Sequence, residues 1–211
     1  MSRFFLPLIA AAVLAIPAAS WAQQTKPKPA APAAKPAAPA KPAAAAKPAA
    51  PAQRPAEPPA IGGVQPTLLG QFGDWGAYTA SPAGRKLCFA LAKPASSTTN
   101  PPNRPRDPAF FFVSTRPAEK VKDEVSIIIG YAFKPNSDAT VDVAGANFGL
   151  YTQNDGAWIK NAAEEAKMVD ALRRGSDAVV KGVSGRGTQT TDTFSMKGLG
   201  QALDRVAQEC R

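Results

Sequence analysis

The side chains available for chemistry are limited in kind, because this chain of 211 residues has two cysteines and no histidine. Without histidine it has no Ser-His-Asp or Cys-His nucleophile system and no His-ligated zinc site. Two cysteines are also too few for a zinc site made of thiolates alone. We therefore predict a protein that is not an enzyme, with no catalytic residue, no metal site and no cofactor.

The two cysteines, Cys88 and Cys210, are expected to form a disulfide. Cys88 lies in a short apolar run, whereas Cys210 continues the apolar face of a C-terminal helix, so the bond would join the end of the chain to an early strand. It would close a loop of roughly 120 residues, which the loop-entropy model values at about 4–5 kcal/mol. Two buried free thiols and a redox-active pair are the alternatives, although a redox pair is usually spaced C-x-x-C.

Arg104 and Arg106 are the best candidate contact residues. They lie in a proline-rich stretch, 93–108, that we expect to be a long surface loop. Long loops often carry binding residues, and a merely solvated loop is the alternative. Ser184 lies in the glycine-rich segment 182–187, which lacks the Gly-x-Ser-x-Gly pattern and a histidine to activate the serine, so we expect a turn between strands there.

The N-terminal part of the chain predicts export. Residues 1–22 have the form of a secretory signal peptide, with an apolar run followed by a small-x-small cleavage site. Residues 23–66 are a low-complexity Pro/Ala/Lys spacer that we expect to be disordered, because it has few large apolar side chains to bury. The expected location is periplasmic, outer-envelope or secreted, with no transmembrane span after cleavage.

The net charge of +9 belongs mostly to this spacer, which has six basic residues and one acidic residue. Its cationic positions include Lys26, Lys35, Lys41 and Lys47, and the last three recur with a period of six, which places them on one edge of a polyproline II helix. Such a stripe of positive charge would be attracted to peptidoglycan or lipopolysaccharide. The alternative is that the segment is only a spacer whose lysines keep it soluble. The rest of the chain is nearly balanced in charge, which gives no argument for a polyanion-binding face. An exported chain rarely meets nucleic acid, so we expect no such partner.

Residues 67–211 have enough aromatic and β-branched side chains for one domain with its own core. We predict a mainly β domain, an antiparallel sandwich or barrel-like sheet, with two α-helices. The helices are expected at Ala162–Arg174, after an Asn161 cap, and at about Leu199–Cys210. The expected strands are apolar or alternating runs between turn residues, at Trp75–Ala80, Leu87–Ala92, Ala109–Arg116, Val125–Tyr131, Ala139–Val143, Phe148–Thr152, Ala178–Ser184 and Thr188–Ser195.

Three short segments of this domain carry a resemblance to a known family. They are Phe72-Gly73-Asp74-Trp75, Leu87-Cys88-Phe89 and the run Asp192–Leu199, which is followed by a near-terminal cysteine. In order and spacing they resemble the invasion-associated locus B family of exported alphaproteobacterial proteins, over roughly 70–211. The resemblance implies a β-rich envelope domain, linked in some members to host-cell invasion, and it implies no catalytic residue.

The expected function is that of an exported, non-catalytic binding or interaction protein of the cell envelope, whose partner is an unidentified protein or envelope component. A periplasmic structural or assembly factor, such as a chaperone or scaffold, is the first alternative. An enzyme of unknown type is the second, and the absence of histidine disfavours it.

Overall fold

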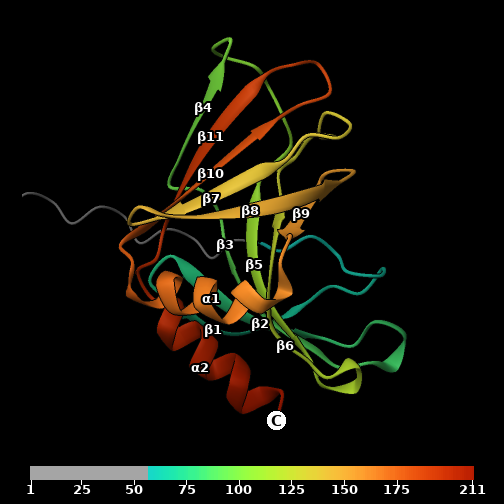
Figure 1. Cartoon of the computed structure of the whole chain (residues 1–211). Coiled ribbons are helices and arrows are strands. Elements are labelled where there is room, and N and C mark those ends of the chain that lie inside the picture. Colours follow the sequence, from blue (N-terminus) through green and yellow to red (C-terminus); the bar gives the residue numbers. More distant parts are fainter. Residues whose placement is uncertain (1–56) are drawn as a thin grey trace, which may run out of the picture. The chain divides into compact units, whose positions relative to one another are not determined.

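The computed structural model describes residues 57–211, which form a large antiparallel sheet with two α-helices (Figure 1). The mainly β fold with two helices that the sequence predicts is confirmed. The predicted signal peptide at 1–22 and the four spacer lysines, Lys26, Lys35, Lys41 and Lys47, lie outside the described residues. Neither helix in the described range is long and apolar enough to cross a membrane.

Eleven strands of the described chain form a single sheet, in the spatial order β1-β2-β3-β5-β6-β9-β8-β7-β10-β11-β4. All neighbouring pairs are antiparallel. The strands are β1 (Thr67–Phe72), β2 (Trp75–Ala80), β3 (Leu87–Ala92), β4 (Ser96–Asn100), β5 (Phe110–Arg116), β6 (Val121–Ile128), β7 (Ala139–Val143), β8 (Ala146–Gln153), β9 (Gly156–Ile159), β10 (Asp177–Val183) and β11 (Gln189–Ser195). Although β4 directly follows β3 in the chain, it lies at the far edge of the sheet beside β11 (Figure 1).

Strands β3 and β5 are buried on both faces of the sheet. Since successive side chains of a strand point to opposite faces, each strand contributes to two apolar clusters. Cys88, Phe111 and Val113 belong to the main core, whereas Phe89 and Phe112 belong to a smaller cluster. Burial on both faces explains why these strands read in the sequence as continuous apolar runs.

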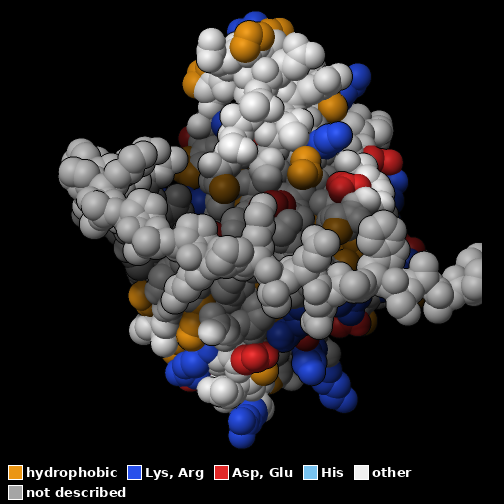
Figure 2. Space-filling model, turned by 90° about the vertical axis from the view of Figure 1, so that its left-hand side faces the viewer, with side chains coloured by type: hydrophobic (Ala, Val, Ile, Leu, Met, Phe, Trp, Pro, Cys, Tyr) orange, Lys and Arg blue, Asp and Glu red, His pale blue; other side chains and the backbone are white. Residues whose placement is uncertain are grey.

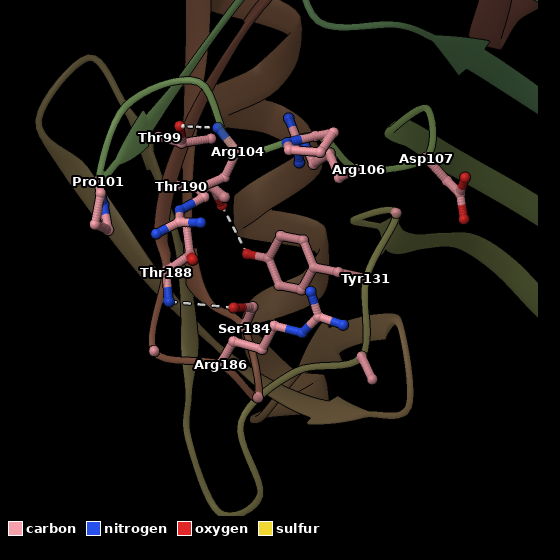
Figure 3. A pocket seen from close by; sticks show the side chains of 15 residues that line it. Thr99, Pro101, Arg104, Arg106, Asp107, Tyr131, Ser184, Arg186, Thr188 and Thr190 are labelled. Atoms are coloured by element: carbon pink, nitrogen blue, oxygen red, sulfur yellow. Dashed lines mark hydrogen bonds between the residues drawn. The ribbon is translucent and has the colours of Figure 1, made fainter.

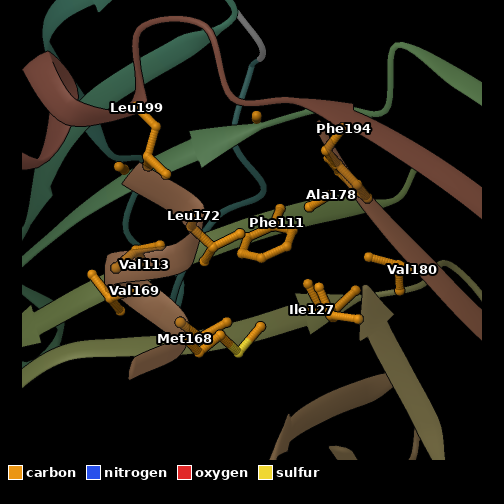
Figure 4. Packing of buried hydrophobic residues seen from close by; sticks show 14 of the residues in the cluster. Phe111, Val113, Ile127, Met168, Val169, Leu172, Ala178, Val180, Phe194 and Leu199 are labelled. Carbon is orange, nitrogen blue, oxygen red and sulfur yellow. The ribbon is translucent and has the colours of Figure 1, made fainter. Parts of the chain in front are cut away.

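Helix α1 (Glu165–Arg174) follows a 3-10 turn at Ala162–Glu164. The Asn161 side chain accepts a hydrogen bond from the Ala163 backbone N–H at 3.1 Å, so the predicted cap is present, although the first turn is a 3-10 turn. The buried residues of α1 recur at helical spacing and are Met168, Val169 and Leu172. Figure 4 shows these side chains packed in one cluster with Phe111 and Ile127 of the sheet.

Helix α2 (Leu199–Glu209) lies against the first strands of the sheet, β1, β2 and β3. Its buried residues are Leu199, Ala202, Leu203 and Val206. The disulfide predicted between Cys88 and Cys210 is present, with the two Cα atoms 6.0 Å apart. Next to it, the Lys86 ammonium group donates to the Glu209 backbone carbonyl at 2.6 Å and to the Glu209 carboxylate at 3.0 Å. The C-terminal end of α2 is thus joined to the beginning of β3 by one covalent bond and by charge-assisted hydrogen bonds.

Two of the segments that carry the family resemblance contact each other. The indole N–H of Trp75, a fully buried residue, donates to the Ser195 backbone carbonyl at 2.8 Å. Gly198 has a positive φ of 94°, and a Cβ there would overlap the Phe72 carbonyl oxygen. The glycine is therefore required by both its backbone conformation and its close neighbour. These residues join the beginning of the sheet to the last strand and helix.

Several segments differ from the prediction. The loop predicted at 93–108 is wrong in its first half, because β4 occupies Ser96–Asn100 and pairs with β11. This strand is polar and mostly exposed, so it shows no apolar alternation. The strand predicted at Val125–Tyr131 is β6, which begins and ends earlier, at Val121–Ile128, and β1 was not predicted.

Candidate functional site

A cleft of about 970 Å³ opens between three loop segments. They are the segment 101–107 that follows β4, residues 130–132 that follow β6, and the turn 184–188 between β10 and β11. The lining residues are mostly polar or small, and they are Thr99, Pro101, Arg104, Pro105, Arg106, Asp107, Gly130, Tyr131, Ala132, Ser184, Gly185, Arg186, Gly187, Thr188 and Thr190. Figure 3 shows Arg104, Tyr131 and Arg186 grouped around the same hollow.

Arg106 anchors the loop that forms one side of the cleft. Its side chain is 12% exposed, and it pairs with the carboxylate of Asp192, which is fully buried. The same guanidinium donates to the Ile129 carbonyl at 2.8 Å and to Ser97 Oγ at 3.1 Å, and its Cζ lies 6.0 Å from the centre of the Tyr131 ring. The second carboxylate oxygen of Asp192 is buried without a hydrogen-bond partner in the described chain. The charge of Arg106 is therefore used within the protein.

Arg104 and Arg186, by contrast, present their guanidinium groups to solvent. Both residues are exposed, and neither forms a salt bridge within residues 57–211. The Arg104 backbone N–H donates to Thr99 Oγ1 at 3.1 Å, which holds the loop in place while leaving the side chain unpaired. Asp107 is the one acid in the lining, and its side chain points away from the hollow in Figure 3.

Most hydroxyl groups of the cleft form hydrogen bonds with neighbouring residues. Tyr131 Oη lies 2.7 Å from Thr190 Oγ1, and Ser184 Oγ accepts the Thr188 backbone N–H at 3.2 Å. Burial raises the pKa of Tyr131 above its ordinary value, so its phenol is neutral at physiological pH. Ser184 stabilises the turn between β10 and β11, so a turn is present as predicted, although 182 and 183 of the predicted segment 182–187 belong to β10.

This arrangement is suited to binding an anion. A guanidinium offers five N–H donors in a planar fork that matches carboxylate and phosphate oxygens. The charge of the buried Asp192 is offset by Arg106, so the two exposed guanidiniums are not neutralised by it. Within the described residues, no group of three or more His, Cys, Asp or Glu side chains is placed to hold a metal ion.

The residues that the sequence singled out have different roles in the structure. Arg104 and Arg106 share the cleft, but only Arg104 has a free side chain. Arg186 was not predicted to be a contact residue, because it lies in a glycine-rich segment that is typical of a turn. The feature that could have identified it is its position between Gly185 and Gly187, at the tip of that turn. The disulfide is not among the residues that line the cleft and has a structural role.

Comparison with known proteins identifies the family. Residues 75–207 match the family described as Invasion associated locus B (IalB) protein, a range that includes the three arginines of the cleft and Asp192. No curated protein and no solved structure matches the chain. Because the family match covers more than half of the sequence, the chain belongs to the Invasion associated locus B family.

Proposed function

We propose that this protein is an exported, non-catalytic binding protein of the cell envelope that contacts its partner through the arginine-lined cleft. The observation that carries the proposal is the pair of exposed guanidiniums, Arg104 and Arg186, on segments that are held in place by internal hydrogen bonds. Because the backbone of these segments is already fixed, binding has to order only the exposed side chains and not the loops that carry them. The cleft is therefore organised before it meets its partner.

Export is supported by three independent features. The N-terminal residues have the pattern of a signal peptide, the chain belongs to a family named for association with invasion, and Cys88 and Cys210 are paired. Disulfides persist in oxidising compartments such as the periplasm and are rare in the cytosol. These features favour the periplasm or the outer envelope, where the protein would take part in host-cell association.

A chaperone or scaffold role has less support from the surface. Such proteins expose large apolar patches to hold their clients. In the described part of the chain, only three large apolar residues are exposed, Val64, Leu68 and Tyr151. In the part of Figure 2 that is not grey, hydrophobic side chains form small separate patches among charged and polar ones. Charge and hydrogen bonding are therefore better suited than apolar contact to recognise the partner.

The lysine-rich spacer would serve as a second, weaker point of attachment. Lys35, Lys41 and Lys47 recur at a constant interval, and repeated positive charges attract the anionic peptidoglycan or lipopolysaccharide of the envelope. Deletion of 23–56 is expected to weaken the retention of the protein on isolated cell walls at low salt. Equal retention of the full and shortened chains would remove this attachment from the proposal.

Photo-crosslinking in living cells tests the proposed function. A photoreactive amino acid is placed at Ala132, which lines the cleft and is exposed, and the control carries it at Gln208, an exposed position on α2. We expect a discrete crosslinked product from Ala132 that is absent from Gln208. Identical products from both positions, or none from Ala132, would contradict a binding role for the cleft.

A further inference from the structure

The lining of the cleft constrains the chemistry of what it binds. None of its fifteen residues is leucine, isoleucine, valine, phenylalanine, methionine or tryptophan. A protein partner usually inserts an apolar or aromatic anchor into a matching pocket, and this cleft offers only prolines, one alanine and the half-buried Tyr131 ring for such an anchor. Its ligand must therefore gain most of its affinity from polar contacts.

The polar groups of the cleft are predominantly donors. Thr99 Oγ1 and Ser184 Oγ already accept backbone N–H groups, so the proton of each hydroxyl is left to donate. Arg104 and Arg186 donate only and carry full positive charge. A matching ligand carries many oxygen acceptors, and some of them are anionic.

Two occupants are disfavoured by charge. The spacer of this chain is rich in lysine and would be repelled by the same arginines. A neutral ligand would leave both guanidiniums without a counter-charge after removing water from them. The volume of about 970 Å³ lies near the upper end of the range for small-molecule sites, which leaves room for several linked rings.

We propose that the cleft binds an anionic saccharide, a short sugar chain that bears carboxylate or phosphate groups. Arg104 and Arg186 would hold the anionic oxygens, while the hydroxyls of Thr99 and Ser184 would donate to the sugar oxygens. The Tyr131 ring would pack against the C–H face of a sugar. This inference rests on the proposed function, because it names the ligand class of the same cleft.

Calorimetric titration of the full chain, exported with its own leader, tests the ligand class. The probes are tetragalacturonate, glucose 1,6-bisphosphate, neutral maltotetraose and tetraglutamate, so that sugar and charge are varied separately. We expect binding of one or both anionic saccharides, and their relative affinities show whether carboxylate or phosphate is the preferred anionic group. Binding of maltotetraose as tight as that of the anionic sugars, or tighter binding of tetraglutamate, would overturn the saccharide assignment.

Matched variants test whether binding occurs in the cleft. Arg104→Gln and Arg186→Gln should each weaken the anionic saccharide about tenfold, the effect of losing one charge-assisted interaction. Arg174→Gln removes the same charge from an exposed position on α1 and should leave affinity unchanged. Unchanged affinity in both cleft variants would overturn the proposal, and thermal unfolding of each variant checks that it is folded.

The inference and the proposed function can fail separately. If tetraglutamate alone binds and Arg104→Gln abolishes its binding, the cleft remains a binding site but the saccharide assignment is wrong. If no probe binds while Ala132 still crosslinks a partner in cells, the ligand class is again wrong and the proposed function stands. If Ala132 gives no crosslinked product, the proposed function itself fails.

Discussion

The buried pair of Arg106 and Asp192 gives the sharpest prediction, because the two residues hold the cleft loop against β11. Arg106 is 12% exposed and Asp192 fully buried. Replacement of Arg106 by Met keeps much of the side-chain volume but leaves the Asp192 carboxylate buried without its counter-charge. Breaking one side of such a pair costs about 3–5 kcal/mol, a large part of the about 5–15 kcal/mol that stabilises a typical protein.

A double-mutant cycle separates the cost of leaving the Asp192 charge unpaired from the cost of losing the other contacts of Arg106. In Arg106→Met/Asp192→Leu no charge is stranded, so we expect a loss below about 2 kcal/mol, much of it from the Ile129 carbonyl that loses its donor. Arg104→Met, in the same loop but exposed, should change the free energy of unfolding by less than about 0.5 kcal/mol. Equilibrium unfolding in urea with the disulfide intact measures the wild type, Arg106→Met, Asp192→Leu, the double variant and the Arg104→Met control.

The reasoning fails if Arg106→Met costs less than about 1 kcal/mol, because the buried carboxylate would then not depend on the arginine. It also fails if the double variant is as unstable as Arg106→Met alone. In that case lost packing or lost hydrogen bonds would account for the whole effect, and the pair would not act through its charge.

Three further predictions concern the frame of the fold. Reduction of the Cys88–Cys210 bond, which joins residues 122 apart, should lower the free energy of unfolding by about 4–5 kcal/mol, and an unchanged urea midpoint after reduction would contradict this. Gly198→Ala should cost about 2 kcal/mol or more in thermal unfolding, since φ is positive and the added Cβ meets Phe72, and a near-neutral effect would show that this turn is not constrained. Burial raises the pKa of Glu165, so the folded state retains this proton to a higher pH than the unfolded chain. The stability of the wild type relative to Glu165→Gln should therefore fall as pH rises from about 4 to about 7, and a rise would refute the assignment.

Much of the fold could be predicted from the sequence, because it depends on local patterns of apolar and polar residues. Strands β3 and β5 are apolar throughout, and the two helices show apolar residues at helical spacing. Strand β4 could not be read in this way, because Ser96–Asn100 is polar and is a strand only through its pairing with β11. Edge strands of this kind are determined by a partner that is remote in the sequence.

The candidate site was only partly predictable for the same reason. The loop with Arg104 and Arg106 was identified by its length and its arginines, but nothing local shows that Arg106 pairs with Asp192, 86 residues later. The nearly balanced charge of 67–211 also gave no indication of a cationic cleft. A net charge averages over the surface, whereas folding brings Arg186 into the same hollow as Arg104.

The central claim is that the exposed arginines of the cleft contact the partner, and one in-cell experiment tests it most directly. The photoreactive residue is kept at Ala132, and the yield of its crosslinked product is compared between the parent chain, Arg104→Gln/Arg186→Gln, and Lys167→Gln/Arg174→Gln as the matched loss of two exposed charges on α1. We predict that the product is lost in the first double variant and retained in the second. Equal yields from both double variants would contradict the account.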